Sequence, residues 1–359
     1  MTTDAHETFK LGEFTVPRLW TGLWQLSSNA WGAAPLSKIR QAMGRHVESG
    51  YTAFGRHGAY LTTSGTWLLT AVDPTRALRL ITTAGQFRSS LESPESVFGA
   101  TKYCVFKPTV MSPETVEAAV RQRIERMRTE RVDLLQACLF HWQDYSNPDY
   151  ITAIDILSQL KAQGLITTIG LCNFDAVHTD EICSRFPNTI VSNQIPFSVV
   201  DTRALYALAQ VCTKHGIKLL TYGTLCGGFL ADKWIGEPEP EPYSGSLNPS
   251  QRKYLDLIVK AWGTWALFQE LLILLRSIGD RHNGVSVSNV ATRWVLDHPA
   301  VGAVIVGARL GCSEYTSDNL KVYGLVLTSQ DRAEIEEVLA RSASRQLIET
   351  IGDCGAEYR

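Results

Sequence analysis

Two side chains capable of acid–base chemistry stand in apolar surroundings in this sequence. Lys102 lies in the middle of an apolar stretch, residues 97–105 (VFGATKYCV), and His141 closes the apolar run of residues 132–141 (VDLLQACLFH). Burying a lysine is costly unless its charge has a partner or a role, so Lys102 is a candidate for proton chemistry. In parallel barrels the chemistry gathers where such strands end. On its run alone, His141 fits a simpler interpretation, a hydrogen bond at a strand end.

The elements that would position these residues alternate along most of the chain. Strand and helix patterns follow one another with short connections, which implies parallel strands and right-handed crossovers. The predicted strands are residues 19–26, 52–54, 97–105, 132–140, 166–171, 190–195, 218–222 and 303–306. The predicted helices are residues 35–48, 112–128, 149–163, 175–185, 202–215, 250–281, 286–297, 312–320 and 329–342. Residues 55–83 settle into neither pattern.

Eight strands in this order predict an α/β fold, a (β/α)8 TIM barrel that takes up residues 1–359 as one domain. A loose tail (1–8) and a short hairpin with its turn at Gly12 precede the barrel, and extra C-terminal helices and a tail (344–359) follow it. An open doubly wound sheet is the alternative, but no G-x-G-x-x-G motif follows the first strand.

Composition and charge narrow the class of protein. The 359 residues are 45% hydrophobic and 19% charged with a net charge of -2, which gives no general affinity for nucleic acid or anionic membranes. The eight cysteines form no C-x-x-C pair and no His/Cys cluster, so we expect free thiols in a reducing compartment and no metal site. No signal-peptide pattern is present, and the apolar residues 265–275 are too few to span a bilayer. We therefore expect a cytoplasmic protein.

Nine stretches of the chain resemble the aldo-keto reductase family. They are GLWQL (22–26), GYTAF (50–54), FGATKYCVF (98–106), FHWQDY (140–145), GLCNFD (170–175), SNQIPFSVVD (192–201), YGTLCGGFLADKW (222–234), NVATRWVLDHPAV (289–301) and VIVGARLG (304–311). Each stretch alone is a weak signal, and together they leave little room for coincidence. The resemblance implies a barrel enzyme that moves a hydride from NADPH to a carbonyl carbon.

The resemblance also implies roles for single residues near the reacting carbon. Tyr60 would donate the proton, Lys102 would favour its phenolate, and His141 would orient the substrate carbonyl. The pocket walls would be Trp24, Trp142 and Phe197. From the residues alone, the alternative for Tyr60 is a loop tyrosine with a solvated hydroxyl, and for the tryptophans core packing fits as well as substrate contact does.

A second set of residues would hold NADP(H). Asn173 and Gln194 match the residues that bind the nicotinamide carboxamide, since an amide has both a donor and an acceptor, and Tyr222 matches the aromatic that stacks on the ring. The residues expected at the adenosine 2'-phosphate and adenine are Gly307, Arg309, Ser313 and Asn319, with Glu314 as a weaker candidate. A helix beginning near Cys312 would add backbone N–H groups there.

The sequence departs from the family pattern close to the catalytic residues. The family has an aspartate directly after GYTAF, where it pairs with the lysine, and this chain has Gly55. Candidates for a replacement carboxylate are Asp73, Glu92 and Glu95. Residues 56–84 do not match the family, and about three extra residues precede His141. Either these differences reshape the pocket, or the recorded sequence carries a reading-frame or intron-boundary error.

The leading functional hypothesis is NADPH-dependent reduction of an aldehyde or ketone on a hydrophobic small molecule, such as a secondary metabolite, with a loop at 223–249 that closes over the cofactor. The alternative is an NADP(H)-binding pseudoenzyme or regulatory subunit, because Gly55 damages the catalytic set. A sugar-cleaving barrel needs two facing carboxylates, and only Asp144 and Asp175 lie near strand ends. We expect a small-molecule carbonyl substrate and no nucleic-acid or membrane partner.

Overall fold

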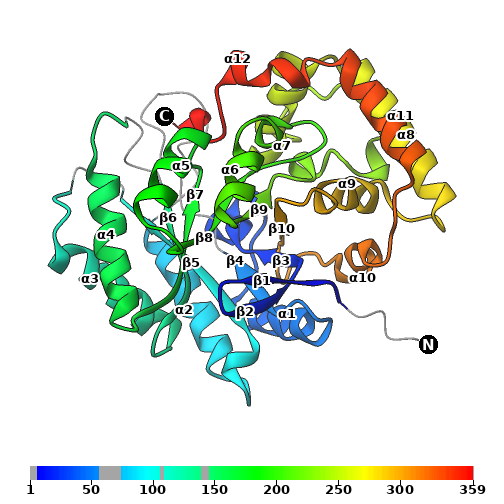
Figure 1. Cartoon of the computed structure of the whole chain (residues 1–359). Coiled ribbons are helices and arrows are strands. Elements are labelled where there is room, and N and C mark those ends of the chain that lie inside the picture. Colours follow the sequence, from blue (N-terminus) through cyan, green and yellow to red (C-terminus); the bar gives the residue numbers. More distant parts are fainter. Residues whose placement is uncertain (1–5, 56–73, 106–108, 139–144, 359) are drawn as a thin grey trace.

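Eight parallel strands close into a barrel in the computed structural model, which describes residues 6–55, 74–105, 109–138 and 145–358 (Figure 1). The strands follow the order β10-β3-β4-β5-β6-β7-β8-β9 around the barrel. Their bounds are β3 (Leu19–Gly22), β4 (Ala53–Gly55), β5 (Phe98–Cys104), β6 (Val132–Cys138), β7 (Ile166–Cys172), β8 (Ile190–Pro196), β9 (Lys218–Tyr222) and β10 (Val301–Gly307). The predicted (β/α)8 barrel is confirmed.

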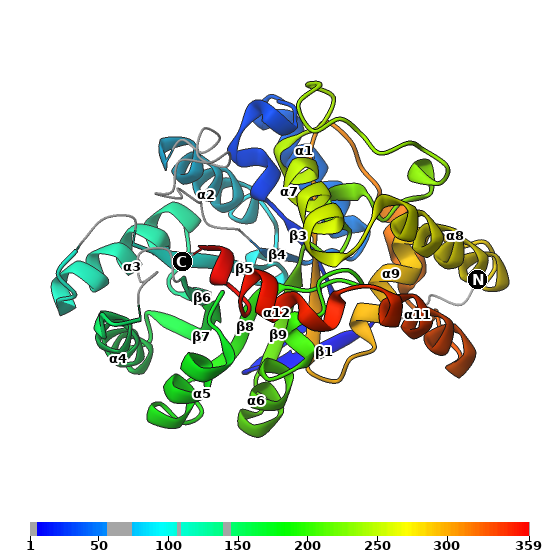
Figure 2. The same cartoon turned by 90° about the horizontal axis from the view of Figure 1, so that it is seen from above.

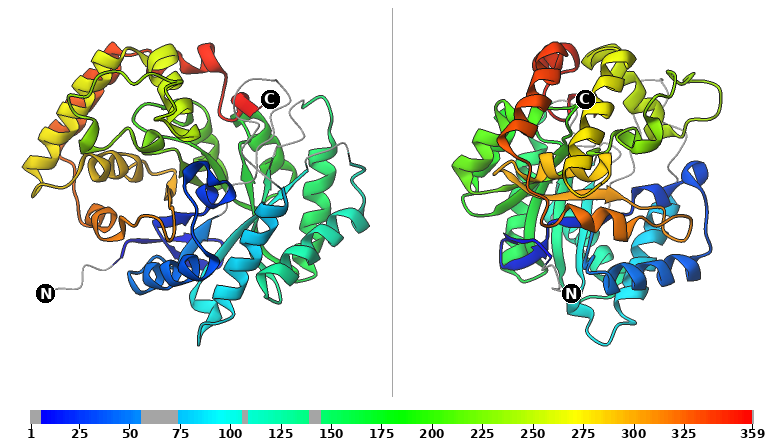
Figure 3. Two further views of the ribbon diagram at one scale, coloured as in Figure 1. Left: turned by 180° about the vertical axis from the view of Figure 1, so that it is seen from behind. Right: turned by 90° about the vertical axis from the view of Figure 1, so that its right-hand side faces the viewer.

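Helices surround the strands, and further helices from the C-terminal third of the chain lie over one end of the barrel (Figures 2 and 3). Side chains cap the starts of several helices. Ser112 Oγ accepts a hydrogen bond from Thr115 N at 3.3 Å at the start of the helix that begins at Pro113, and the Asp175 side chain caps the helix that begins at Ala176 in the same way. The helices are α1 (Leu36–Glu48), α2 (Pro74–Arg88), α3 (Pro113–Met127), α4 (Asp149–Ala162), α5 (Ala176–Arg185), α6 (Leu208–His215), α7 (Pro249–Asp256), α8 (Trp265–Arg281), α9 (Val287–Leu296), α10 (Thr316–Asn319), α11 (Ser329–Arg341) and α12 (Leu347–Ile351).

The predicted hairpin closes the amino-terminal end of the barrel. Strands β1 (Thr8–Leu11) and β2 (Phe14–Pro17) pair antiparallel below the other strands in Figure 1. Leu11 and Val16 are buried with the inward side chains of the barrel, and the ring of Phe14 lies 4.9 Å from that of Phe98. The hairpin therefore fills this end with apolar side chains and leaves the carboxyl ends of the strands for chemistry.

Strand alternation decides which side chains face the barrel interior. Lys102 is in register with Gln136 of β6, which is in register with Gly170 of β7, and residues in register across parallel strands share a face. Tyr103, next to Lys102 in sequence, points outward, because its ring meets the Arg123 guanidinium of α3 at 5.7 Å. Lys102 therefore projects into the barrel, toward its carboxyl end.

Several predicted elements are shorter or broken in the structure. The first strand ends at Gly22, and residues 24–27 form a 3-10 turn instead. The predicted helix 202–215 is a short turn (Arg203–Leu205) followed by α6. The predicted helix 250–281 breaks at Gly263 into α7 with a π-helical extension (Leu257–Trp262) and α8, bent by 106°. Among the described residues, no single helix combines the length and apolarity that a bilayer crossing requires.

Candidate active site

Lys102 is buried at the carboxyl end of β5, with 4% of its surface exposed. Its Nζ donates a hydrogen bond to Cys172 Sγ of β7 at 2.7 Å, across the barrel interior. Its main-chain carbonyl accepts a hydrogen bond from Arg123 Nε of α3 at 2.8 Å, and Arg123 also donates to the carbonyl of Ala119 at 2.6 Å. Arg123 therefore holds the main chain of β5 from the outside at Lys102, while the Lys102 ammonium group points into the barrel.

Gly55 leaves the neighbouring strand β4 without a carboxylate. It is in register with Gly22 and Ala100, and a Cβ built on it would meet the Trp20 ring at 3.4 Å, an ordinary contact. The position thus has room for a side chain directed into the barrel, two residues along the inner face from Lys102.

The carboxylates proposed to replace the missing aspartate do not reach Lys102. Glu92 and Glu95 are exposed and precede the first residue of β5, so they lie at the opposite end of that strand from Lys102. Their prediction as substitutes was wrong, because the strand carries the lysine away from them. Asp73 lies outside the described residues.

Three other predicted residues, Tyr60, His141 and Trp142, also lie outside the described part of the chain. Their roles stay predictions from the family resemblance. The described part of β6 ends at Cys138, which is in register with Cys104 and Cys172.

The structure brings the three predicted nicotinamide residues together at the carboxyl ends of β7, β8 and β9. Asn173 N donates to the carbonyl of Gln194 at 2.9 Å, and Tyr222 Oη donates to Asn173 Oδ1 at 2.8 Å. All three are buried, and Asn173 has a φ of 62°, a left-handed conformation that asparagine tolerates better than most residues. A fixed amide pair beside an aromatic side chain fits the carboxamide of a nicotinamide, which needs one donor and one acceptor.

The predicted adenosine end lies after β10. Arg309 is exposed, and its carbonyl accepts hydrogen bonds from Cys312 N at 2.8 Å and Ser313 N at 3.1 Å, which closes a tight turn. The Gln25 side chain lies against Gly307, where a Cβ would come within 2.0 Å of Gln25 Nε2. An exposed guanidinium on a rigid turn fits a phosphate group.

One expectation about this end was wrong. The predicted helix from Cys312 begins at Thr316 and has only four residues, because residues 309–313 form the turn instead. The Asn319 side chain bonds to the Tyr51 hydroxyl, whose pKa is raised by burial. Glu314 pairs with Arg45 of α1, with Nε 3.0 Å from Oε2, and this guanidinium lowers the Glu314 pKa. The Glu314 carboxylate is thus already paired within the protein, with Arg45 of α1.

The two described pocket candidates differ. Trp24 opens a 3-10 turn, η1 (Trp24–Ser27), and is half-buried, with its ring 6.0 Å from that of Trp31. Phe197 is fully buried, and its ring packs against Trp294 at 5.7 Å and His298 at 5.2 Å. Phe197 is therefore a core residue between β8 and α9, and only Trp24 keeps a position from which a substrate contact is open.

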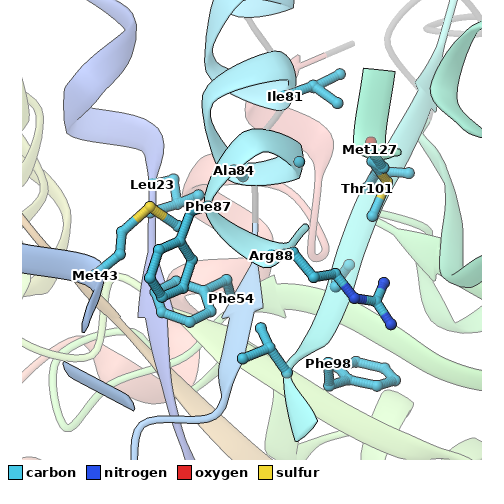
Figure 4. Close-up of a pocket in the computed structure, with 14 residues that line it drawn as sticks. Leu23, Met43, Phe54, Ile81, Ala84, Phe87, Arg88, Phe98, Thr101 and Met127 are labelled. Atoms are coloured by element: carbon cyan, nitrogen blue, oxygen red, sulfur yellow. The ribbon is translucent and has the colours of Figure 1, made fainter. Parts of the chain in front are cut away.

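A separate apolar cavity lies between α2 and strands β4 and β5 (Figure 4). Its volume is about 40 Å³, and its lining includes Phe54, Phe87 and Met127. Pockets for small ligands usually measure about 300–1,000 Å³. This cavity is a packing gap behind the barrel wall and is not a substrate site.

Sequence reasoning missed the contribution of the C-terminal segment. Arg203, 1% exposed, donates to Asp201 Oδ2 at 2.8 Å, to the carbonyls of Gly352 and Asp353, and to Glu357 Oε2 at 3.0 Å. Burial alone would lower the Arg203 pKa, but the two carboxylates raise it above its ordinary value. The cluster seats residues 352–357 over the strand ends (Figure 2).

The seated segment reaches the predicted nicotinamide residues. Asp353 Oδ2 accepts a hydrogen bond from Ala176 N at 3.2 Å, and a Cβ on Gly355 would come within 2.1 Å of the Asn173 carbonyl oxygen. Only a glycine permits this approach, and its φ of 86° also favours glycine. The C-terminal segment thus forms part of the wall around Asn173.

Cys172 was also missed, although strand alternation contains a signal for it. From the sequence it resembles the other cysteines, which serve as small buried hydrophobes. Its place two residues after Gly170 on β7 puts it on the inner face that Lys102 reaches. The alternation of β7 would have placed Cys172 on the inner face, but it could not have shown that Lys102 of β5 reaches Cys172 past the strand β6 between them.

Comparisons with known proteins agree with this geometry. A family model described as the aldo/keto reductase family matches residues 18–340. The chain is 31% identical over 186 residues to flagellar radial spoke protein 5 of Chlamydomonas reinhardtii (47% of this chain, 34% of that protein). It is 26% identical over 235 residues to aldo-keto reductase YhdN of Bacillus subtilis (63% of each chain).

These matches span about a third of the first relative's length and less than two thirds of the second's. Among solved structures, a glycerol dehydrogenase from Gluconobacter oxydans has the same fold, with a TM-score of 0.71, 20% identity, and coverage of 96% of this chain and 97% of that one. Because the family model covers nearly the whole barrel, the chain belongs to the aldo/keto reductase family, whose members generally reduce carbonyl groups with a nicotinamide cofactor.

Proposed function

We propose that this protein reduces an aldehyde or ketone on a hydrophobic small molecule, with NADPH as the hydride donor and Tyr60 as the proton donor. The observation that carries the proposal is the placement of a buried Lys102 at the same barrel end as the Asn173, Gln194 and Tyr222 group. When bound, the reduced nicotinamide supplies a hydride to the carbonyl carbon. The chain's own residues hold its carboxamide and move the proton to the carbonyl oxygen.

Each residue has one task in this reaction. Asn173 and Gln194 fix the carboxamide, and the Tyr222 bond to Asn173 Oδ1 fixes which way the asparagine amide points. The Lys102 ammonium favours negative charge on the Tyr60 oxygen after the proton has left it. The buried, water-poor interior strengthens this interaction between charges.

Support for NADPH over NADH comes from Arg309. Its guanidinium is exposed at the rim, on a turn held by two main-chain hydrogen bonds. A bidentate contact with the 2'-phosphate would strengthen NADPH binding by about 1.5–3 kcal/mol, the range for hydrogen bonds to charged groups.

Replacing Arg309 by alanine should therefore weaken NADPH binding about tenfold or more and leave NADH binding unchanged, as measured by cofactor fluorescence. An equal loss for both cofactors would contradict the assignment.

We further propose a bulky, apolar substrate of secondary-metabolite type and a cytoplasmic location. Trp24 beside Trp31 offers aromatic surface near the strand ends, and no disulfide joins the cysteines that the structure describes, as in a reducing compartment. The loop after β9 is anchored by Phe229, whose ring packs on Trp234 and Trp265, so closure over the cofactor would involve the part beyond this anchor.

The alternative is an NADP(H)-binding protein without turnover, and Gly55 on the inner face of β4 is the observation that favours it. The deciding experiment follows NADPH absorbance with a panel of aldehydes and ketones. We expect carbonyl-dependent loss of NADPH for at least one apolar member. Tight NADPH binding with no carbonyl-dependent oxidation across the panel would favour the pseudoenzyme.

A further inference from the structure

The loop between β7 and α5, residues 173–175, holds Asn173 in a conformation that needs support from its surroundings. Asn173 has a φ of 62°, and its main-chain N–H donates to the Gln194 carbonyl at 2.9 Å. A residue other than glycine keeps a left-handed conformation only where the structure around it fixes that conformation. The backbone of Asn173 also sets the direction of its side-chain amide. Whatever fixes this loop, the Asn173 loop, therefore also aims the amide.

The C-terminal segment, residues 352–357, contacts the Asn173 loop at both of its ends. At the start of the loop, a Cβ on Gly355 would lie 2.1 Å from the Asn173 carbonyl oxygen, so the two main chains are packed directly together. Just after the loop, Ala176 N, the first N–H group of α5, donates to Asp353 Oδ2 at 3.2 Å. The other carboxylate oxygen, Asp353 Oδ1, accepts a hydrogen bond from Cys354 N at 2.6 Å, which fixes the Asp353 side chain.

A buried arginine holds the C-terminal segment in this place. Arg203 donates to the carbonyls of Gly352 and Asp353 at 3.1 and 3.2 Å, and to the two Glu357 carboxylate oxygens at 3.0 and 3.1 Å. It therefore grips the segment before and after the contact with the loop. Asp201 accepts two hydrogen bonds from the same guanidinium at 2.8 Å each, so the arginine is itself fixed.

We propose that the C-terminal segment clamps the Asn173 loop and so presents the asparagine amide to the nicotinamide carboxamide, with Gly355, Arg203 and Glu357 as positioning residues. This role rests on the proposed function. With the segment lifted, the loop would be free to leave its left-handed conformation, and cofactor affinity would fall in proportion to the fraction of molecules that keep it. The nicotinamide end is the same in NADPH and NADH, so both cofactors should lose affinity equally.

The first test measures hydrogen exchange in the cofactor-free protein. Gly355→Ala places a Cβ at the contact and should speed exchange of the Ala176 amide about tenfold or more, because this amide loses its bond to Asp353 whenever the segment lifts. Gly164→Ala is the matched control, just before the other end of β7. Gly164 has a φ of 83°, close to the 86° of Gly355, and no atom lies within 4 Å of its added Cβ. This control should leave Ala176 exchange at the parent rate.

A second variant loosens the anchor without placing a new atom in the contact. Glu357→Gln keeps the size of the side chain and removes the negative charge that faces Arg203. It should speed exchange of the Ala176 amide about threefold, a smaller effect because the hydrogen bonds from Arg203 to the main chain remain. The control is Glu270→Gln, which removes the exposed partner of Arg341 and should leave the exchange rate unchanged.

The second test measures cofactor affinity by fluorescence titration. Gly355→Ala should weaken binding of NADPH and of NADH about tenfold each, whereas Arg309→Ala should weaken binding of NADPH alone. In an Asn173→Ala background, Gly355→Ala should cause no further loss, because the amide that the segment positions is already gone. A purely structural role of the segment would lower the free energy of unfolding and leave the affinity of the folded protein unchanged.

The two tests separate the inference from the proposed function. Parent exchange rates at Ala176 in both Gly355→Ala and Glu357→Gln would show that the segment does not clamp the loop, which overturns the inference. Faster exchange with unchanged cofactor affinity, or a full additional loss in the Asn173→Ala background, would overturn the positioning role. If the parent protein binds neither cofactor, the proposed function fails, and the exchange result still decides whether the clamp exists.

Discussion

The carboxyl ends of β7–β9 and those of β4–β6 hold their polar residues in different ways. On the first side, Asn173 and Tyr222 are joined by a neutral hydrogen bond, and the C-terminal segment is seated against Asn173. On the second side, Lys102 meets sulfur, and Gly55 stands in place of an acid. The proposed cofactor side is therefore built from neutral groups of fixed geometry, whereas the proposed catalytic side depends on charge.

Because of this difference, cofactor binding and catalysis can be considered separately, although membership of the family suggests both. Under the proposed function, the cofactor side would bind a nicotinamide whatever the state of Lys102, because neutral amides do not titrate. The proposed chemistry would require the charge on the other side. A protein of this family can thus lose turnover and keep its ligand, and changes on the two sides should have separable effects.

The largest expected effect comes from removing the charge on the catalytic side. Lys102→Met should lower kcat by about 10²- to 10⁴-fold, the range for general acid–base assistance, because the tyrosine loses the cation that favours its phenolate. NADPH affinity, measured by fluorescence, should stay near that of the parent protein. A parallel loss of affinity would mean that the two sides are not independent.

The next effect concerns the anchor of the C-terminal segment. Arg203→Met should lower the free energy of unfolding by about 3–5 kcal/mol, because Asp201 and Glu357 would be left without their buried cation. Urea unfolding measures this change. The matched control is Arg121→Met, which breaks an exposed pair with Glu117 and should cost less than about 0.5 kcal/mol. Similar losses in both variants would show that the anchor is unimportant.

The smallest effect comes from a single neutral hydrogen bond. Tyr222→Phe removes the bond to Asn173 Oδ1 and should weaken NADPH binding by about 1 kcal/mol, or about fivefold. Titration of cofactor fluorescence measures it. Tyr206→Phe serves as a control, since the Tyr206 hydroxyl makes a long 3.4 Å bond to the Ser344 carbonyl, away from the site. An effect of 100-fold would show that the ring position, and not one bond, has been lost.

The barrel and part of its site could be predicted from the sequence because they follow from local pattern. Each predicted strand is present, and the inward Lys102 follows from a charge within an apolar strand. The predictions failed where an apolar residue continues a pattern in the sequence but takes a different place in the fold. Trp24 continues the first apolar run but turns into a 3-10 helix, and Phe197 is as aromatic as a pocket wall but packs against α9.

Other features depend on contacts between distant parts of the chain. The Lys102–Cys172 contact joins residues 70 positions apart, and Arg203 meets Glu357 across 154 positions. No local periodicity encodes such a meeting, since it depends on strand register and on where the last residues return. The helix predicted at Cys312 failed for a local reason, the tight turn at Arg309.

The hairpin of β1 and β2 has one more consequence. Leu11, Val16 and their neighbours fill the floor of the barrel, so the residues that the structure describes leave no passage along the barrel axis at this end. Under the proposed function, reactant and product would therefore use the same opening at the rim, and the exchange of product for the next reactant would limit the rate of repeated cycles.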